Sequence, residues 1–117
     1  GYDPGVLHAT VHTGAYNHVK KTSKGKMMTS ADLCGSFRTY QLKWTADRIE
    51  IGVDGVNYFA YDNDHGGKQE TWPFDKPFGV LLNLAIGGKW GGMKGIDDDA
   101  LPQRMEVDFV RVFQRSH

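Results

Sequence analysis

Residues 79–92 read GVLLNLAIGGKWGG, and the predicted fold depends most on this segment. It is the most apolar run of the chain, and the two-residue period of a strand places apolar side chains on both of its faces. The first face holds Val80, Leu82, Leu84 and Ile86, and the second holds Leu81, Asn83 and Ala85. A strand that is apolar on both faces is typical of a sheet covered on both sides. Asn83 is its one polar side chain, and its face either ties neighbouring backbone together or lines a ligand cleft.

Short alternating segments separated by turns extend this pattern over the rest of the chain. Residues 7–13 alternate strictly between apolar and polar side chains. One face carries Leu7, Ala9 and Val11, and the other carries His8, Thr10 and His12. Residues 48–53 and 56–61 read as strands joined by Asp54 and Gly55, a pair that favours a two-residue hairpin turn.

Further strands are predicted for residues 37–45 and 105–114, whereas residues 14–36 read as a long polar loop. Residues 72–77 contain two prolines, which fit only the start of a strand or an edge. No helix longer than a turn or two is expected, and nothing marks a second domain. We therefore expect residues 1–117 to form one domain of the all-β class, as an antiparallel sandwich or a barrel.

The composition excludes several classes of function. The formal net charge is zero, so the chain lacks the electrostatic signature of a protein that binds nucleic acid or an anionic membrane. The four lysines within residues 20–26 are interpreted as part of a solvated loop. Cys34 is the single cysteine, so it forms no internal disulfide. The sequence has no signal-peptide pattern and no long apolar run, so we expect a soluble mature chain.

Candidate catalytic and metal-binding groups are few. Glu106 and Asp108 would share one face of a strand, but no third acid follows there, and we interpret the pair as structural. Residues 97–99 are three aspartates that suit calcium but read more simply as an exposed loop. His8 and His12 lack a third zinc ligand. The glycines of residues 87–95 lack the features of a phosphate-binding loop, and no G-x-S-x-G motif occurs.

Trp90 is the aromatic side chain best suited to contact a ligand. It stands between two pairs of glycines, which makes it hard to bury. We interpret it as a flat platform for a sugar ring, with a plug that fills its own loop as the alternative. Trp44 and Trp72 flank strands and are expected in the core or at its rim.

Four segments, taken in order, resemble the C-terminal half of a glycoside hydrolase family 16 enzyme of the laminarinase type. They are VHTGAYNH (residues 11–18), FRTYQLKWTADRIEIGVDG (37–55), WPFDKPFGVLLNLAIGGKWGG (72–92) and LPQRMEVDFVRVFQ (101–114). The resemblance implies a concanavalin-like β-jelly roll, a sandwich of two curved antiparallel sheets of which this chain forms about half. The concave sheet of that fold forms a cleft for an extended glucan. The implied activity is hydrolysis of β-1,3-glucan or mixed-linkage β-glucan with retention, by a secreted protein.

The catalytic signature of that family is absent from the 117 residues. It reads E-x-D-x-x-E or E-x-D-x-E on one strand, so that its acids project together into the cleft. It normally lies just before the segment that begins here as GYDPG. We therefore expect no catalytic residue in this chain, and we expect the chain to be inactive alone. Its expected partner is the N-terminal half of the same enzyme or a copy of itself with exchanged strands.

The resemblance assigns roles to five residues. Thr10 and His12 match cleft-facing positions on the strand after the catalytic one. Asn83 matches an asparagine on the neighbouring concave strand, and Trp90 matches the aromatic residue at the rim of the cleft. Asp108 matches an aspartate that binds a structural calcium ion on the convex side of family members.

Two other functions stay open on the sequence. In the first, the chain is a non-catalytic β-glucan-binding module whose cleft survives without the acids. In the second, it is an interaction domain that uses only its strand edges. The preference between β-1,3 and mixed-linkage glucan also stays open, because it depends on loops that lie partly outside these residues.

Overall fold

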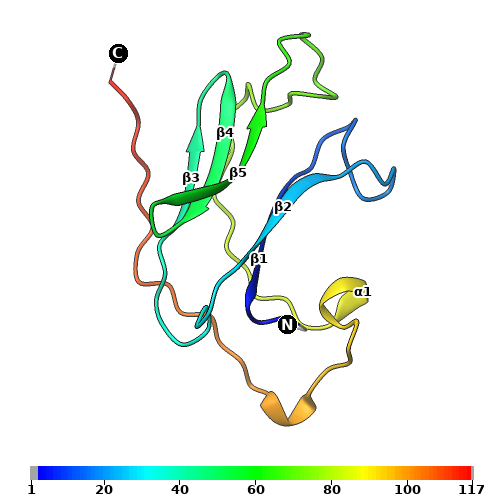
Figure 1. Ribbon diagram of the computed structural model, residues 1–117, viewed down its shortest axis with the longest axis vertical. Helices are drawn as coiled ribbons and strands as arrows, with labels where there is room; N and C mark the ends of the chain where they lie inside the picture. The colour runs from blue at the N-terminus through cyan, green and yellow to red at the C-terminus, as the bar shows by residue number, and fades with distance from the viewer. Residues whose placement is uncertain (1–2, 117) are drawn as a thin grey trace. The chain divides into compact units, whose positions relative to one another are not determined.

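The computed structural model of the protein describes residues 3–116, which form two compact units (Figure 1). The first unit, Asp3–Gly79, contains every strand of the described residues. The second unit, residues 80–116, contains the short helix α1 (Gly88–Gly91) and the 3-10 turn η1 (Asp98–Ala100). Among the described residues, no helix has the length and apolar character needed to cross a membrane.

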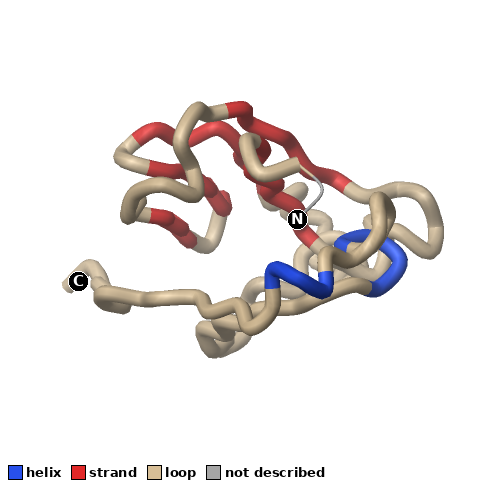
Figure 2. Tube along the Cα trace, turned by 90° about the horizontal axis from the view of Figure 1, so that it is seen from below, coloured by secondary structure: helices blue, strands red, loops and turns tan. Residues whose placement is uncertain are grey.

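The strands of the first unit form two antiparallel sheets, drawn in red in Figure 2. Strand β1 (Val6–Val11) pairs with β2 (Lys24–Thr29), with Ala9 opposite Lys26 and Thr10 opposite Gly25. The other sheet has the order β3-β4-β5 and consists of β3 (Tyr40–Trp44), β4 (Arg48–Val53) and β5 (Val56–Asp62). All the pairings are antiparallel, which confirms the predicted all-β class.

The hairpin between β4 and β5 forms where the sequence predicted it. Asp54 and Gly55 have φ values of 49° and 83°, and a two-residue turn that matches the strand twist needs positive φ at both positions. The Asp54 carboxylate also accepts hydrogen bonds from the Thr39 N–H at 3.0 Å and from Arg38 at 3.1 Å. The turn is therefore fixed by its backbone chemistry and tied to the start of β3.

The core of the first unit joins residues from both sheets. It consists of Ala9, Val11, Ile49, Phe59, Tyr61 and Trp72. Ala9 and Val11 are 3% and 5% exposed, whereas Thr10 between them is exposed, so the alternation predicted for this strand is confirmed. Trp72 stacks on Tyr61 with ring centroids 5.6 Å apart, as a core position requires.

The prediction that residues 14–36 form one long loop is wrong for β2. Strand β2 reads KGKMMT, which carries no apolar alternation, and it exists because its backbone pairs with β1 over six residues. Lys24 lies on the core side of this strand, with its ammonium group 3.8 Å from the centroid of the Tyr16 ring. A cation over an aromatic ring takes the place of an aliphatic contact here, so a hydrophobic pattern could not reveal the strand.

The strands predicted for residues 79–86 and 105–114 are also wrong for the described chain. Both segments lack a strand ladder, and their apolar side chains stay exposed, as Leu84 at 50% and Phe109 at 51% illustrate. A strand exists only through hydrogen bonds to a neighbour, and an apolar pattern does not say where that neighbour is. Residues 72–77 likewise form turns and irregular backbone rather than the start of a strand.

Replacing Trp72 with alanine should lower the free energy of unfolding by roughly 3–5 kcal/mol, because it removes a buried ring and leaves a cavity. Urea denaturation followed by circular dichroism measures the change. Val19→Ala is the matched control, because Val19 is 78% exposed and its loss should change stability little. Equal effects of the two substitutions would contradict the core described here.

Candidate functional site

Strand β1 presents Thr10 to the surface on the face opposite the core, and His12 continues that face just beyond the strand end. Both side chains are exposed, whereas Val11 between them and Thr13 after them are buried. Gly25 faces Thr10 across the β1–β2 pair. A Cβ atom at Gly25 would lie 2.5 Å from the Ala9 carbonyl and 2.8 Å from the Thr10 hydroxyl. The glycine therefore keeps the two strands paired and leaves the Thr10 hydroxyl accessible.

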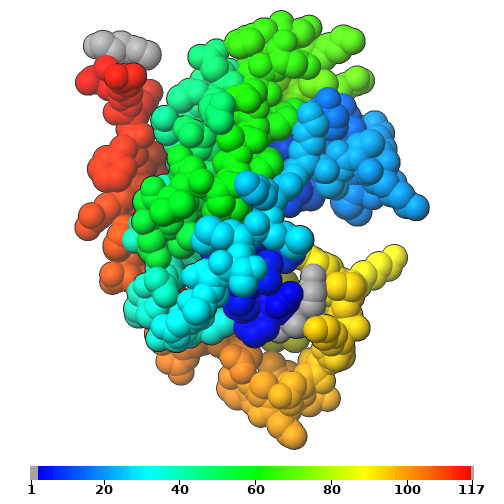
Figure 3. Space-filling model, in the orientation of Figure 1, coloured from blue at the N-terminus to red at the C-terminus, as the bar shows by residue number. Residues whose placement is uncertain are grey.

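The loop that follows His12 is organised around Asn17. Its amide donates hydrogen bonds to the carbonyls of Thr13 at 3.0 Å and Gly14 at 3.3 Å, and its carbonyl oxygen accepts one from the Lys20 N–H at 3.0 Å. The buried hydroxyl of Thr13 accepts a hydrogen bond from the Tyr16 N–H at 2.9 Å. This loop, residues 13–22, stands out from the first unit as the light-blue lobe in Figure 3.

The loop brings a second imidazole beside His12. The His18 ring lies with its centroid 6.3 Å from that of His12, and the two ring planes are nearly perpendicular at 80°. The sequence reading did not single out His18 or Asn17. The indication of an ordered loop in the sequence is the pair of polar residues Thr13 and Asn17, which stand four positions apart in a segment without apolar periodicity.

The three remaining predicted site residues lie in the second unit, and none of their assigned roles is tested by this arrangement. Asn83 and Asp108 are exposed, and Trp90 lies in α1 with 58% of its surface exposed. Gly87 enters this helix with a φ of 74°, and a Cβ atom there would lie 2.8 Å from the Ile96 side chain. A glycine is therefore required for the chain to turn into the helix that carries Trp90.

No group of three or more His, Cys, Asp or Glu side chains that could hold a metal ion occurs within residues 3–116. Asp108 offers one carboxylate, whereas calcium takes about 6–8 oxygen ligands, so the residues present do not complete a calcium site. The aspartates of residues 97–99 have a local role, since the Asp97 carboxylate accepts a hydrogen bond from the Asp99 N–H at 3.2 Å and caps η1.

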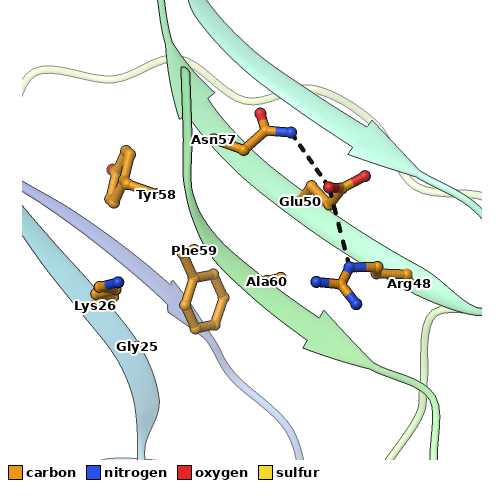
Figure 4. Close-up of a pocket in the computed structure, with 8 residues that line it drawn as sticks. All are labelled: Gly25, Lys26, Arg48, Glu50, Asn57, Tyr58, Phe59 and Ala60. Atoms are coloured by element: carbon orange, nitrogen blue, oxygen red, sulfur yellow. Dashed lines mark hydrogen bonds and ion pairs between the residues drawn. The ribbon is translucent and has the colours of Figure 1, made fainter. Parts of the chain in front are cut away.

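A hollow of about 450 Å³ lies beside β5 (Figure 4). Its lining residues are Gly25, Lys26, Arg48, Glu50, Asn57, Tyr58, Phe59 and Ala60. It contains none of the residues predicted to line the cleft. Its single carboxylate, on Glu50, is already bound by cations, and we therefore do not assign catalysis to this hollow.

The surroundings of Glu50 keep it ionised. Its carboxylate lies 3.0 Å from the Lys43 ammonium and 4.0 Å from the Arg48 guanidinium, and it accepts a hydrogen bond from Asn57 at 3.3 Å. The hydrogen bond from Lys43 is the main cause that holds the pKa of Glu50 below its usual value, with smaller help from Arg48 and Asn57 and against some desolvation. A carboxyl group with a lowered pKa cannot act as the proton donor of a glycosidase near neutral pH.

The other two glutamates of the chain are no better placed for catalysis. Glu106 is exposed in the second unit and forms an ion pair with Arg104 at 3.4 Å. Glu70 of the first unit is also exposed, and its backbone carbonyl accepts a hydrogen bond from the Ala15 N–H at 2.7 Å. The described residues therefore contain an exposed polar face on β1 but no recognisable pair of catalytic carboxylates.

The chain resembles a known family and several known proteins. Residues 1–111 match glycosyl hydrolases family 16. The β-glucanase of Rhodothermus marinus is 39% identical over 97% of this chain, which covers 41% of that protein. The crystal structure of SCLam, a non-specific endo-β-1,3(4)-glucanase, is 56% identical with a TM-score of 0.82, and the match covers 86% of this chain and 37% of SCLam.

The X-ray structure of the laminarinase from Rhodothermus marinus has a TM-score of 0.84 at 38% identity, over 87% of this chain and 42% of the laminarinase. The chain thus spans about two fifths of the length of these relatives. The likeness confirms the predicted antiparallel β-sandwich of the jelly-roll type and the predicted family resemblance. The chain belongs to glycosyl hydrolases family 16.

Proposed function

We propose that this chain supplies the substrate cleft of a retaining endo-β-glucanase of the laminarinase type, whose catalytic acids lie on an N-terminal segment or a separate chain. The observation that carries this proposal is a family match over residues 1–111 in a chain that lacks the E-x-D-x-x-E motif. The β-glucanase and laminarinase names of the similar proteins support β-glucan as the substrate.

Retaining hydrolysis requires a nucleophilic carboxylate and a carboxylic acid about 5–5.5 Å apart across the scissile bond. Glu50 is held ionised among Lys43 and Arg48, and Glu106 is paired with Arg104. Neither side chain has the surroundings of a proton donor. We therefore propose that the chain alone is inactive and that the acids are supplied by residues outside it.

We further propose that Thr10, His12, Asn83 and Trp90 contact the glucan. Thr10 and His12 share the exposed face of β1, and Trp90 offers an exposed ring that suits stacking against a pyranose. We also propose that the protein is secreted, because polymeric glucan is too large to enter a cell.

The protein that carries this chain together with an E-x-D-x-x-E strand should release reducing sugar from laminarin, whereas the 117 residues alone should release none. Substituting the first glutamate of that motif should abolish release, while Glu50→Gln and Glu106→Gln should leave kcat within about twofold. Intact mass spectrometry of the active sample identifies the polypeptides present. Loss of activity in either of the two glutamine variants would show that this chain supplies a catalytic residue and would contradict the proposal.

A non-catalytic β-glucan-binding module is the second candidate, because the chain combines the exposed face of β1 with no identified catalytic acids. The same experiment separates the two functions. Tight binding of laminarin without any release of sugar by the assembled protein would favour the binding module and exclude the hydrolase.

Trp90→Ala should weaken binding of laminarin or lichenan by roughly tenfold, since an aromatic contact of this kind contributes on the order of 1 kcal/mol or more. Isothermal titration calorimetry on the assembled protein measures the affinity. Phe37→Ala is the control, because Phe37 is an exposed aromatic residue, 71% exposed, with no proposed role in the cleft or in pairing with a partner. An unchanged affinity of the Trp90 variant would assign the ring to filling its own loop.

We also propose that Asp108 contributes one ligand to a structural calcium ion, with the remaining oxygens from backbone carbonyls and from segments outside this chain. Calcium should then raise the melting temperature of the assembled protein by mass action, and Asp108→Ala should abolish the rise. Differential scanning calorimetry with calcium and with EDTA measures it. Asp98→Ala, an exposed acid of the same unit, should keep the full response; a full response in the Asp108 variant would refute the assignment.

The partner that we propose is the N-terminal half of the same enzyme or a copy of this chain with exchanged strands. Apolar side chains in the two segments that lack a ladder support this proposal, because Leu82 is 56% exposed and Phe113 is 87% exposed. Neighbouring strands would supply the missing hydrogen bonds and cover these side chains.

A further inference from the structure

We propose that His18 is a further substrate-contacting residue, which acts with His12 as a pair of imidazoles that hold one sugar unit of the glucan. This inference rests on the proposed function and names part of the surface that recognises the glucan. Asn17 is proposed as the positioning residue that fixes His18 beside His12.

The two imidazoles lie beside each other at the surface of the first unit. Their centroids are 6.3 Å apart and their planes are 80° apart, so the edge of one ring is directed at the face of the other. Both residues are exposed. A neutral imidazole carries one donor and one acceptor, and two rings set at right angles direct these groups along different lines. Adjacent hydroxyls of a pyranose, each both donor and acceptor, match that arrangement.

Hydrogen bonds within the loop that carries His18 restrict its conformation. The Asn17 N–H donates to the Thr22 hydroxyl at 3.2 Å, and the Thr22 N–H donates back to the Asn17 carbonyl at 3.1 Å. The His18 carbonyl accepts a hydrogen bond from the Lys21 N–H at 3.2 Å. The Thr22 hydroxyl donates to the Ala15 carbonyl at 2.7 Å. Fixing an exposed side chain before the ligand arrives lowers the entropic cost of binding.

The loop is also anchored to the core. The Ala15 N–H donates to the Glu70 carbonyl at 2.7 Å, two residues before the buried Trp72, and the Tyr16 ring contacts the Tyr61 ring at 6.3 Å. These contacts hold the two residues that precede Asn17. The position of His18 is therefore set by the same core that orients β1 and His12.

The charged side chains of the loop that carries His18 are Lys20 and Lys21. Within residues 3–116, no ion pair joins a carboxylate to His12 or His18, whereas His65 of another loop pairs with Asp47. The Lys20 ammonium is folded back onto the Gly14 carbonyl of its own loop. The pair thus lacks the carboxylate that would orient a catalytic imidazole, and hydrogen bonding to sugar hydroxyls is the role that its geometry suits.

The test measures binding and turnover of laminarin oligosaccharides by the assembled protein. His18→Ala should raise KM and Kd by roughly 2- to 10-fold with kcat unchanged, since one hydrogen bond contributes about 0.5–1.5 kcal/mol. His18→Gln, which keeps a donor and an acceptor, should recover part of the affinity. Asn17→Ala should weaken binding in the same direction as His18→Ala. His65→Ala, which removes an exposed histidine of another loop, should change neither constant.

Two further measurements separate contact from a structural effect. The imidazole resonances of His12 and His18, but not of His65, should shift when oligosaccharide is added. The His12→Ala and His18→Ala effects should be non-additive in a double-mutant cycle, because both rings contact one sugar unit. A melting temperature of His18→Ala close to that of the parent excludes loss of fold as the cause.

The outcomes distinguish this inference from the proposed function. If the parent protein binds and cleaves laminarin while His18→Ala keeps its KM and Kd, the inference is wrong and the proposed function stands. If the parent protein neither binds nor cleaves any β-glucan, both are wrong. If EDTA removes the affinity that depends on His18, the two imidazoles hold a metal ion and the inference is overturned.

Discussion

The first unit depends on the packing around Tyr61. This ring stacks on Trp72 at 5.6 Å and meets Tyr16 and Phe74 edge-on at 6.3 and 6.2 Å, and its hydroxyl donates to the Thr71 carbonyl. A single side chain on β5 thereby contacts the loop after β1 and the segment that follows β5. Buried aromatic rings of this size account for much of the apolar surface in so small a core. The Tyr61 hydroxyl is satisfied within the core, which removes the penalty of burying it.

The same packing positions the candidate site. Ala9 and Val11 are buried against this aromatic cluster. Because alternate residues of a strand point to opposite faces, Thr10 and His12 lie on the outward face. The Tyr16 contact holds the loop that carries His18 in place, and Lys24 adds a cation over the Tyr16 ring from the neighbouring strand. The polar face is therefore preorganised by apolar packing on the other side of one strand.

The charged groups of the β3-β4-β5 sheet serve a different purpose. Arg48 contacts Asp62 at 2.9 Å and Glu50 at 4.0 Å, while Lys43 contacts Glu50 from β3. The Arg48–Asp62 pair joins β4 to β5, and the Lys43–Glu50 pair joins β3 to β4. A glycosidase acid needs a raised pKa, and this network lowers the pKa of Glu50 instead, so the chemistry of this sheet opposes catalysis.

The features of this protein that could be predicted from its sequence are local ones. The alternation of residues 7–13, the bounds of β4, and the turn at Asp54 and Gly55 follow from side-chain period and backbone preference, which act over a few residues. The exposure of Thr10 and His12 follows from the same period. The remaining features could not be predicted, because they depend on contacts with residues that are distant in the chain. Strand β2 exists through pairing with β1, and residues 80–86 lack a ladder although their pattern is strongly apolar. His18 reaches His12 through the loop bonds of Asn17, and no periodicity in the sequence encodes that contact.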